Sequence, residues 1–167
     1  QAPEITQIES VKDTEKYLDN DQFDLFIIFN EPQNTGLLTF TKNIKETHPN
    51  LPIVYLANHT AQLQPLLETD NYETIDRAFT WNGDGSILLT IIQLFEDQTN
   101  IQSNPSGENK EIILLVEDNI QYYSSYLSLI YEELWKYTAN LMHHDLTLVQ
   151  KNRRYQRRPF ILHTTDF

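Results

Sequence analysis

The sequence predicts an α/β protein with a doubly wound, parallel five-stranded sheet and an extended C-terminal long helix. Two continuous apolar runs, Asp24–Asn30 and Pro52–Ala57, are typical of strands buried on both faces of such a sheet. Amphipathic segments of about ten residues alternate with these runs, which favours crossover helices on both faces. Apolar side chains spaced three and four apart after residue 119 predict the long helix.

Strands and helices are expected to alternate over the first hundred residues. The expected strands are Thr6–Ser10, Asp24–Asn30, Pro52–Ala57 and Ile75–Thr80. The expected helices are Val11–Asn20, Gly36–Thr47, Thr60–Thr69 and Ser86–Glu96, the last capped by Asp84 or Ser86. Together they predict a sheet-forming unit over residues 1–97.

A polar segment over residues 98–110, which carries Pro105 and Gly107, predicts a linker. Residues 111–167 then begin with an apolar strand at Glu111–Asn119 and end with a strand at Phe160–His163. The long helix between them has a seam of heptad spacing, typical of a helix packed lengthwise on a partner. The seam residues are Ile120, Tyr123, Leu127, Ile130, Leu134, Tyr137 and Leu141.

Composition narrows the class of protein. The chain of 167 residues is 40% hydrophobic, enough to build a core. It has no cysteine, which fits a reducing compartment, and we expect it to be soluble and cytoplasmic, with no membrane contact. A formal net charge of −12 disfavours nucleic acid as a partner, because phosphates repel an acidic surface.

The most informative motif is Ile-Leu-Leu-Val-Glu-Asp-Asn at residues 113–119. It resembles the first strand of response-regulator receiver domains, where an acidic pair at the end of the strand helps to hold Mg²⁺ beside a phosphorylatable aspartate. The resemblance implies a tentative Mg²⁺ site at Glu117 and Asp118 and no other cofactor. Carboxylate oxygens are suitable ligands for this ion.

The first hundred residues resemble a receiver from its second strand onward. Phe23–Ile28 is similar to the third strand, Pro52–His59 to the fourth strand and its loop, and Asp76–Thr80 to the fifth strand. The resemblance implies a flavodoxin-like fold with strand order 2-1-3-4-5.

The resemblance fails at the residues that carry the chemistry. The phosphoacceptor position falls on Phe29, or on Asn30 after a one-residue shift. The switch hydroxyl falls on Ala57, and the lysine falls on Trp81, or on Asn82 with a shift. None of these side chains supports aspartyl phosphorylation, so the pattern is that of a pseudo-receiver with no catalytic residue.

Residues 1–97 lack the first strand and helix of a receiver, and residues 111–150 supply elements of that type. A sheet without its central strand would leave rows of backbone groups unpaired, at about 1–3 kcal/mol each. We therefore expect Glu111–Glu117 to insert between Thr6–Ser10 and Asp24–Asn30, either in cis or by swapping between two chains.

These observations favour a non-enzymatic signal-transduction module that binds a protein partner, or itself as a dimer, through the long helix. Two alternatives remain. The chain could belong to a phosphorelay receiver of a two-component system whose phosphorylatable aspartate lies beyond residue 167. It could instead be a flavodoxin-like domain or enzyme that binds a small ligand at the ends of its strands.

Overall fold

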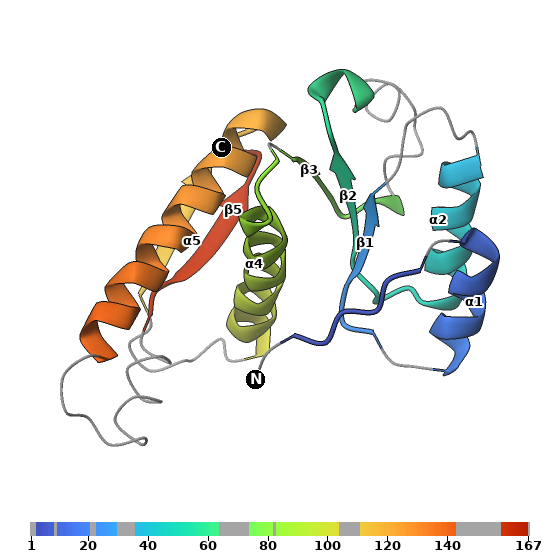
Figure 1. Ribbon diagram of the computed structural model, residues 1–167, viewed down its shortest axis with the longest axis horizontal. Coiled ribbons are helices and arrows are strands. Elements are labelled where there is room, and N and C mark those ends of the chain that lie inside the picture. The colour runs from blue at the N-terminus through green and yellow to red at the C-terminus, as the bar shows by residue number, and fades with distance from the viewer. Residues whose placement is uncertain are drawn as a thin grey trace. The chain divides into compact units, whose positions relative to one another are not determined.

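The computed structural model describes most of the chain and shows an α/β protein built from parallel strands and helices (Figure 1). The described residues are 3–8, 10–20, 23–29, 36–63, 74–81, 83–103, 111–142 and 158–166. They form two compact units, Gln1–Ala78 and Phe79–Phe167, with a three-stranded sheet of order β1-β2-β3 and a two-stranded sheet of β4 and β5. The parallel α/β class is confirmed.

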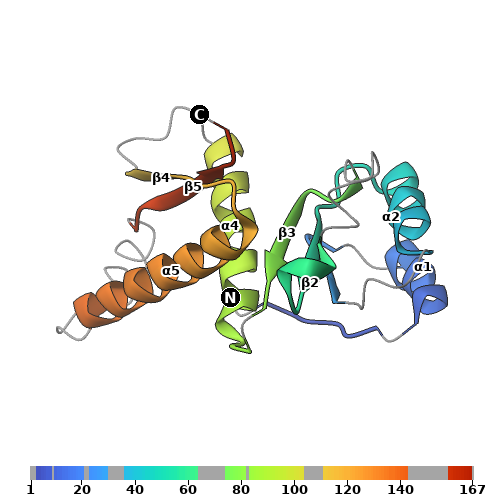
Figure 2. The same ribbon diagram turned by 90° about the horizontal axis from the view of Figure 1, so that it is seen from above.

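In the first unit, strand β1 (Phe26–Phe29) pairs in parallel with β2 (Ile53–Ala57), and Phe26 lies opposite Ile53. All five residues of β2 are buried, as expected for an apolar strand between two neighbours. Helices α1 (Val11–Asn20) and α2 (Gly36–Thr47) lie side by side along one face of this sheet, as Figures 1 and 2 show. Phe40 of α2 meets Phe26 edge to face at 6.1 Å between ring centroids.

A polar cluster holds the start of this sheet in register. Asp76 lies just before β3 (Arg77–Thr80) and exchanges hydrogen bonds with Ile53: its amide donates to the Ile53 carbonyl at 2.9 Å, and its Oδ2 accepts from the Ile53 amide at 2.6 Å. Lys45 Nζ donates to the same carboxylate at 2.7 Å and to the Leu51 carbonyl at 2.9 Å. The cluster therefore ties the end of α2 to the start of β2.

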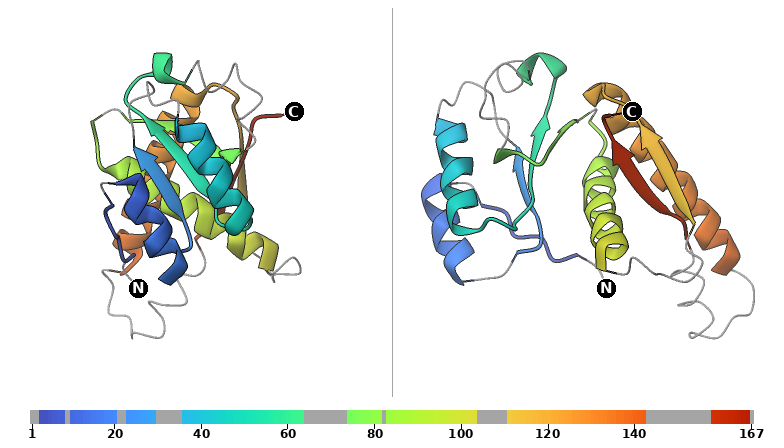
Figure 3. Two further views of the ribbon diagram at one scale, coloured as in Figure 1. Left: turned by 90° about the vertical axis from the view of Figure 1, so that its right-hand side faces the viewer. Right: turned by 180° about the vertical axis from the view of Figure 1, so that it is seen from behind.

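In the second unit, strand β4 (Ile112–Val116) pairs in parallel with β5 (Phe160–Thr164), and Ile112 lies opposite Phe160. Helices α4 (Ser86–Ser103) and α5 (Ile120–Met142) pack against each other, and α4 also contacts β5 (Figure 3). The 23 residues of α5 make a helix about 35 Å long, twice the length of a five-residue strand.

Most predicted elements agree with the structure. The helices Val11–Asn20 and Gly36–Thr47 have the predicted bounds, and all the predicted strands after residue 20 are present with bounds shifted by up to three residues. Helix α4 continues to Ser103, beyond its predicted end at Glu96 and into the predicted linker. A short 3₁₀ helix, η1 (Thr60–Gln62), stands at the start of the predicted helix Thr60–Thr69, whose residues 64–69 lie outside the described part.

The strand predicted at Thr6–Ser10 is wrong. Residues 6–8 and Ser10 lie in neither a helix nor a strand. The five-residue pattern contains a single strongly apolar side chain, Ile8, which is too little to bury a strand. The neighbour of β4 in the structure is β5, not this segment.

Candidate functional site

The carboxyl ends of the parallel strands are where α/β proteins usually place functional side chains. In the first unit, β1 ends at Phe29, which is 50% exposed, and β2 ends at Ala57, which is 0% exposed. Neither side chain carries an oxygen, a nitrogen or a charge, so neither can accept or stabilise a phosphoryl group. Asn30 and Asn82, the positions reached by a one-residue shift, lie outside the described residues.

The loop that follows Ala57 is closed by an amide side chain. Gln62 Oε1 accepts from the backbone amides of Asn58 at 2.7 Å and His59 at 3.4 Å. The backbone amide of Gln62 in turn donates to the His59 carbonyl at 2.9 Å. These polar groups of the loop are therefore hydrogen-bonded to one another. Sequence reasoning missed Gln62, because a glutamine five residues after a strand has no distinctive signal.

Trp81 follows β3 directly and begins the connection to α4. Gly83 has a φ of +90°, a backbone angle that residues other than glycine adopt only at a cost in free energy. Asp84 Oδ1 accepts from the Ser86 amide at 3.0 Å, as the predicted cap requires, and this hydrogen bond lowers the pKa of the Asp84 carboxyl. The segment therefore acts as a turn and a helix cap.

The acidic pair lies at the end of β4, as the motif predicts. Glu117 Oε1 accepts from the Asn119 amide at 3.0 Å, and Asn119 Oδ1 accepts from the amides of Gln121 and Tyr122 to cap α5. Asp118 is exposed. The part of the chain that the structure describes contains no group of three or more His, Cys, Asp or Glu side chains arranged to hold a metal. The Mg²⁺ expectation thus rests on two carboxylates, one of which stabilises a turn.

A buried histidine connects this edge to α5. His163 of β5 is 2% exposed, and its Nε2 lies 2.9 Å from the Glu117 carbonyl. Because a carbonyl oxygen only accepts, Nε2 carries the hydrogen. The ring packs on Tyr123 at 4.4 Å between centroids, and Tyr123 meets Phe79 edge to face. His163 therefore supports the strand end and the first turn of α5.

Among the described residues, Asp97 has a carboxylate that accepts four hydrogen bonds, and the sequence analysis did not single it out. Its side chain is 0% exposed. Both carboxylate oxygens accept from the Arg158 guanidinium, at 2.6 and 3.0 Å, and Oδ2 also accepts from the Ile161 amide at 2.9 Å and the Tyr131 hydroxyl at 3.0 Å. The cluster of Asp97, Tyr131, Arg158 and Ile161, hereafter the Asp97 cluster, joins α4, α5 and β5.

The Arg158 guanidinium also lies 5.9 Å from the ring centroids of Tyr131 and Phe160, so it interacts with two aromatic faces as well as the carboxylate. A buried bidentate pair of this kind holds two segments in one geometry. The Asp97 cluster therefore has a structural role, because its carboxylate accepts hydrogen bonds from groups of the protein itself.

The long helix does not bury the predicted seam along its whole length. Tyr123 and Leu127 are buried, Ile120, Ile130 and Leu134 are half-buried, and Tyr137 is 63% exposed. The side chain of Leu141 lies outside the described part. The buried face continues instead through Tyr131 and Thr138, because a straight helix of 3.6 residues per turn drifts away from a seven-residue repeat.

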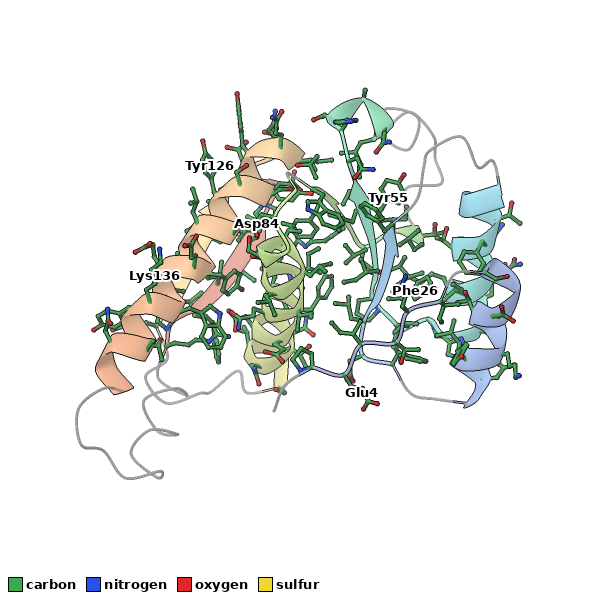
Figure 4. All side chains as sticks on the ribbon, viewed as in Figure 1. Glu4, Phe26, Tyr55, Asp84, Tyr126 and Lys136 are labelled. Atoms are coloured by element: carbon green, nitrogen blue, oxygen red, sulfur yellow. The ribbon has the colours of Figure 1, made fainter. Side chains whose placement is uncertain are left out.

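On the other side, α5 presents large side chains to solvent. The exposed ones are Tyr122, Tyr126, Leu129 and Tyr137, whereas the partly exposed Trp135 donates its Nε1 hydrogen to Gln93 of α4 at 3.1 Å. The rings of Tyr122 and Tyr126 stack at 6.1 Å. Figure 4 shows Tyr126 and Lys136 on the side of α5 that faces away from α4. Lys136 pairs with Glu132 and Glu133 at 2.8 and 2.9 Å.

Tyr131 makes the stability of the protein depend on alkaline pH. Burial, reinforced by the charge of Asp97, raises the pKa of Tyr131 well above its ordinary value of 10.0. The unfolded chain loses this proton near pH 10 and the folded chain keeps it. The free energy of unfolding therefore has its full value below that pH and falls by about 1.4 kcal/mol per unit above it.

We expect Tyr131→Phe to remove this part of the alkaline loss, because phenylalanine has no proton to release. Urea unfolding at about pH 9 and about pH 11 measures the slope for the variant and the parent chain. Tyr122→Phe is the matched control, since Tyr122 is 52% exposed on the same helix. An unchanged slope in Tyr131→Phe would contradict the assignment.

Comparison of the chain with protein-family models, with curated proteins and with solved structures found no match. The likeness to receiver domains therefore rests on the residues of this sequence and remains a prediction. Among the described helices, none is long and apolar enough to cross a membrane.

Proposed function

We propose that this chain is a non-catalytic interaction module of a signal-transduction protein, built like a receiver domain that has lost its phosphoacceptor. The observation that carries the proposal is the end of β1, a half-exposed Phe29, which the sequence resemblance aligns with the phosphorylatable aspartate of receivers. The buried Ala57 at the end of the adjacent strand supports it, because this position offers no switch hydroxyl.

The finer form of the fold belongs to this proposal. The five parallel strands would make a flavodoxin-like sheet of order β5-β4-β1-β2-β3, in which β4 and β5 take the places of the first and second receiver strands. Two facts support it: each sheet is parallel, and β1 and β4 are both end strands in the described residues. The absence of cysteine fits the cytoplasm as the place of action.

A module without chemistry acts through its surface. The exposed aromatic and leucine side chains of α5 supply large contact area with few rotatable bonds, as protein interfaces do. The net charge of −12 favours a protein partner over nucleic acid for this surface.

The test is incubation with acetyl phosphate and Mg²⁺, followed by intact-mass measurement. We expect no mass increase of one phosphoryl group, because the sheet ends at Phe29 and Ala57 present no nucleophile. A phosphorylatable receiver domain treated in parallel shows that the reagent is active. Hydroxylamine-sensitive labelling of an aspartate would overturn the proposal, and the variants Asp118→Asn and Asp24→Asn would identify the acceptor.

A further inference from the structure

Strand β4 exposes three apolar side chains although it has the composition of a buried strand. The side chains of Ile112, Ile113 and Leu114 are 51%, 36% and 59% exposed. They alternate between the two faces of the strand, so apolar surface is exposed on both faces. A strand of this composition is typical of the middle of a parallel sheet, and here it has one neighbour, β5.

The hydrogen bonds to β5 show which backbone groups face outward. The Phe160 amide donates to the Glu111 carbonyl, and the Glu117 amide donates to the Thr164 carbonyl. In a parallel ladder the residues of one strand face its neighbour alternately. Residues 111, 113, 115 and 117 therefore face β5, and the amides and carbonyls of Ile112, Leu114 and Val116 point to the outer edge.

The first unit offers a matching edge. Strand β1 bonds to β2 at Phe26, whose amide donates to the Pro52 carbonyl at 2.9 Å. By the same alternation, Ile27 directs its amide and carbonyl to the other side, and β1 is the end strand of the sheet as described. Both edges belong to apolar strands of parallel sheets. Strand β1 has four residues and β4 has five.

We propose that the outer edge of β4 pairs in parallel with the outer edge of β1 in a second copy of this chain. Ile27 then lies opposite Ile113, because its amide and carbonyl reach the groups of Ile112 and Leu114. The same register brings the starts of the two strands level, as they are in the pairs β1–β2 and β4–β5.

A second copy fits better than an unrelated strand because each copy carries both edges. Two copies related by a two-fold axis satisfy both β4 edges and both β1 edges at once, so neither of these edges is left to recruit a third copy. Right-handed crossovers place α2 and α5 on opposite faces of the joined sheet, so the helices do not collide. The pairing rests on the strand order given under the proposed function, and it adds that the junction of β4 with β1 is made between two copies.

The absence of cysteine from the chain makes a clean test possible. Ile27→Cys and Ile113→Cys proteins are mixed, unfolded, refolded together and oxidised. Neighbouring parallel strands bring paired Cα atoms within the range that a disulfide spans, about 4.4–6.8 Å. We expect a heterodisulfide of twice the chain mass in this mixture, and none when Ile27→Cys is mixed with Leu129→Cys on the exposed side of α5.

The unsubstituted protein should have twice the chain mass in light scattering. Leu114→Pro removes an amide that faces the outer edge and leaves the ladder with β5 intact, so we expect a monomer with unchanged far-UV circular dichroism. Ile112→Lys, which keeps the backbone amide, should give the same result. An unsubstituted protein that stays monomeric, or a disulfide that forms within a single doubly substituted chain, would overturn the proposal. The acetyl phosphate test is independent of either outcome.

Discussion

Replacing Asp97 with alanine is expected to lower the free energy of unfolding by about 3–5 kcal/mol, the cost of removing one partner of a buried ion pair. The substitution leaves the Arg158 guanidinium, which is 10% exposed, without its carboxylate. It also leaves the Ile161 amide and the Tyr131 hydroxyl without their acceptor. The loss should appear as a lower midpoint in urea or thermal unfolding.

A paired substitution separates charge from hydrogen bonding at this position. Asp97→Asn keeps the shape and one acceptor oxygen but removes the charge, so its loss should be smaller than that of Asp97→Ala. Asp118→Ala is the matched control, since Asp118 is exposed, and should change stability by less than about 0.5 kcal/mol. Equal effects of Asp97→Ala and Asp118→Ala would show that the Asp97 cluster does not form in solution.

The second large effect is expected at Leu127, which is 0% exposed on the inner side of α5. Leu127→Ala should cost about 2–5 kcal/mol, because the lost side chain leaves a cavity between packed elements. Leu129→Ala, two residues further along the helix, removes the same atoms from a side chain that is 58% exposed and should cost less than about 0.5 kcal/mol.

This pair of variants also tests the role of the helix. If the seam residue Leu127 served only as a docking contact, the loss of stability would be small and partner binding would suffer. If Leu129 belongs to the partner surface, Leu129→Ala should weaken binding at unchanged stability. Chemical denaturation of the two variants measures the stability, and a binding assay with the partner protein measures the contribution of the exposed surface.

The regular elements could be predicted because their signals are local. The buried runs around Ile27 and Val54 and the spacing within α2 depend on neighbours a few residues away, and they gave the right elements. The prediction of a strand at Thr6–Ser10 was wrong because a strand is stable only beside another strand. A short local pattern does not show which segment would pair with it. The pairing of β4 with β5 joins residues nearly fifty positions apart.

The Asp97 cluster could not be predicted from the sequence because it depends on the tertiary structure. Asp97 and Arg158 are separated by 61 positions. An aspartate near the end of an amphipathic helix normally faces solvent. The acidic pair at Glu117 and Asp118 could be located from its motif, but the use of Glu117 as a turn acceptor depends on backbone geometry that the motif does not encode.

Three polar contacts join α4 to α5: Thr90 to Ser128, Gln93 to Trp135 and Asp97 to Tyr131. A slide of one helix past the other by a single turn would break all three. These contacts therefore fix the register of the two helices, and an axial displacement of α5 against α4 would require the loss of all three hydrogen bonds.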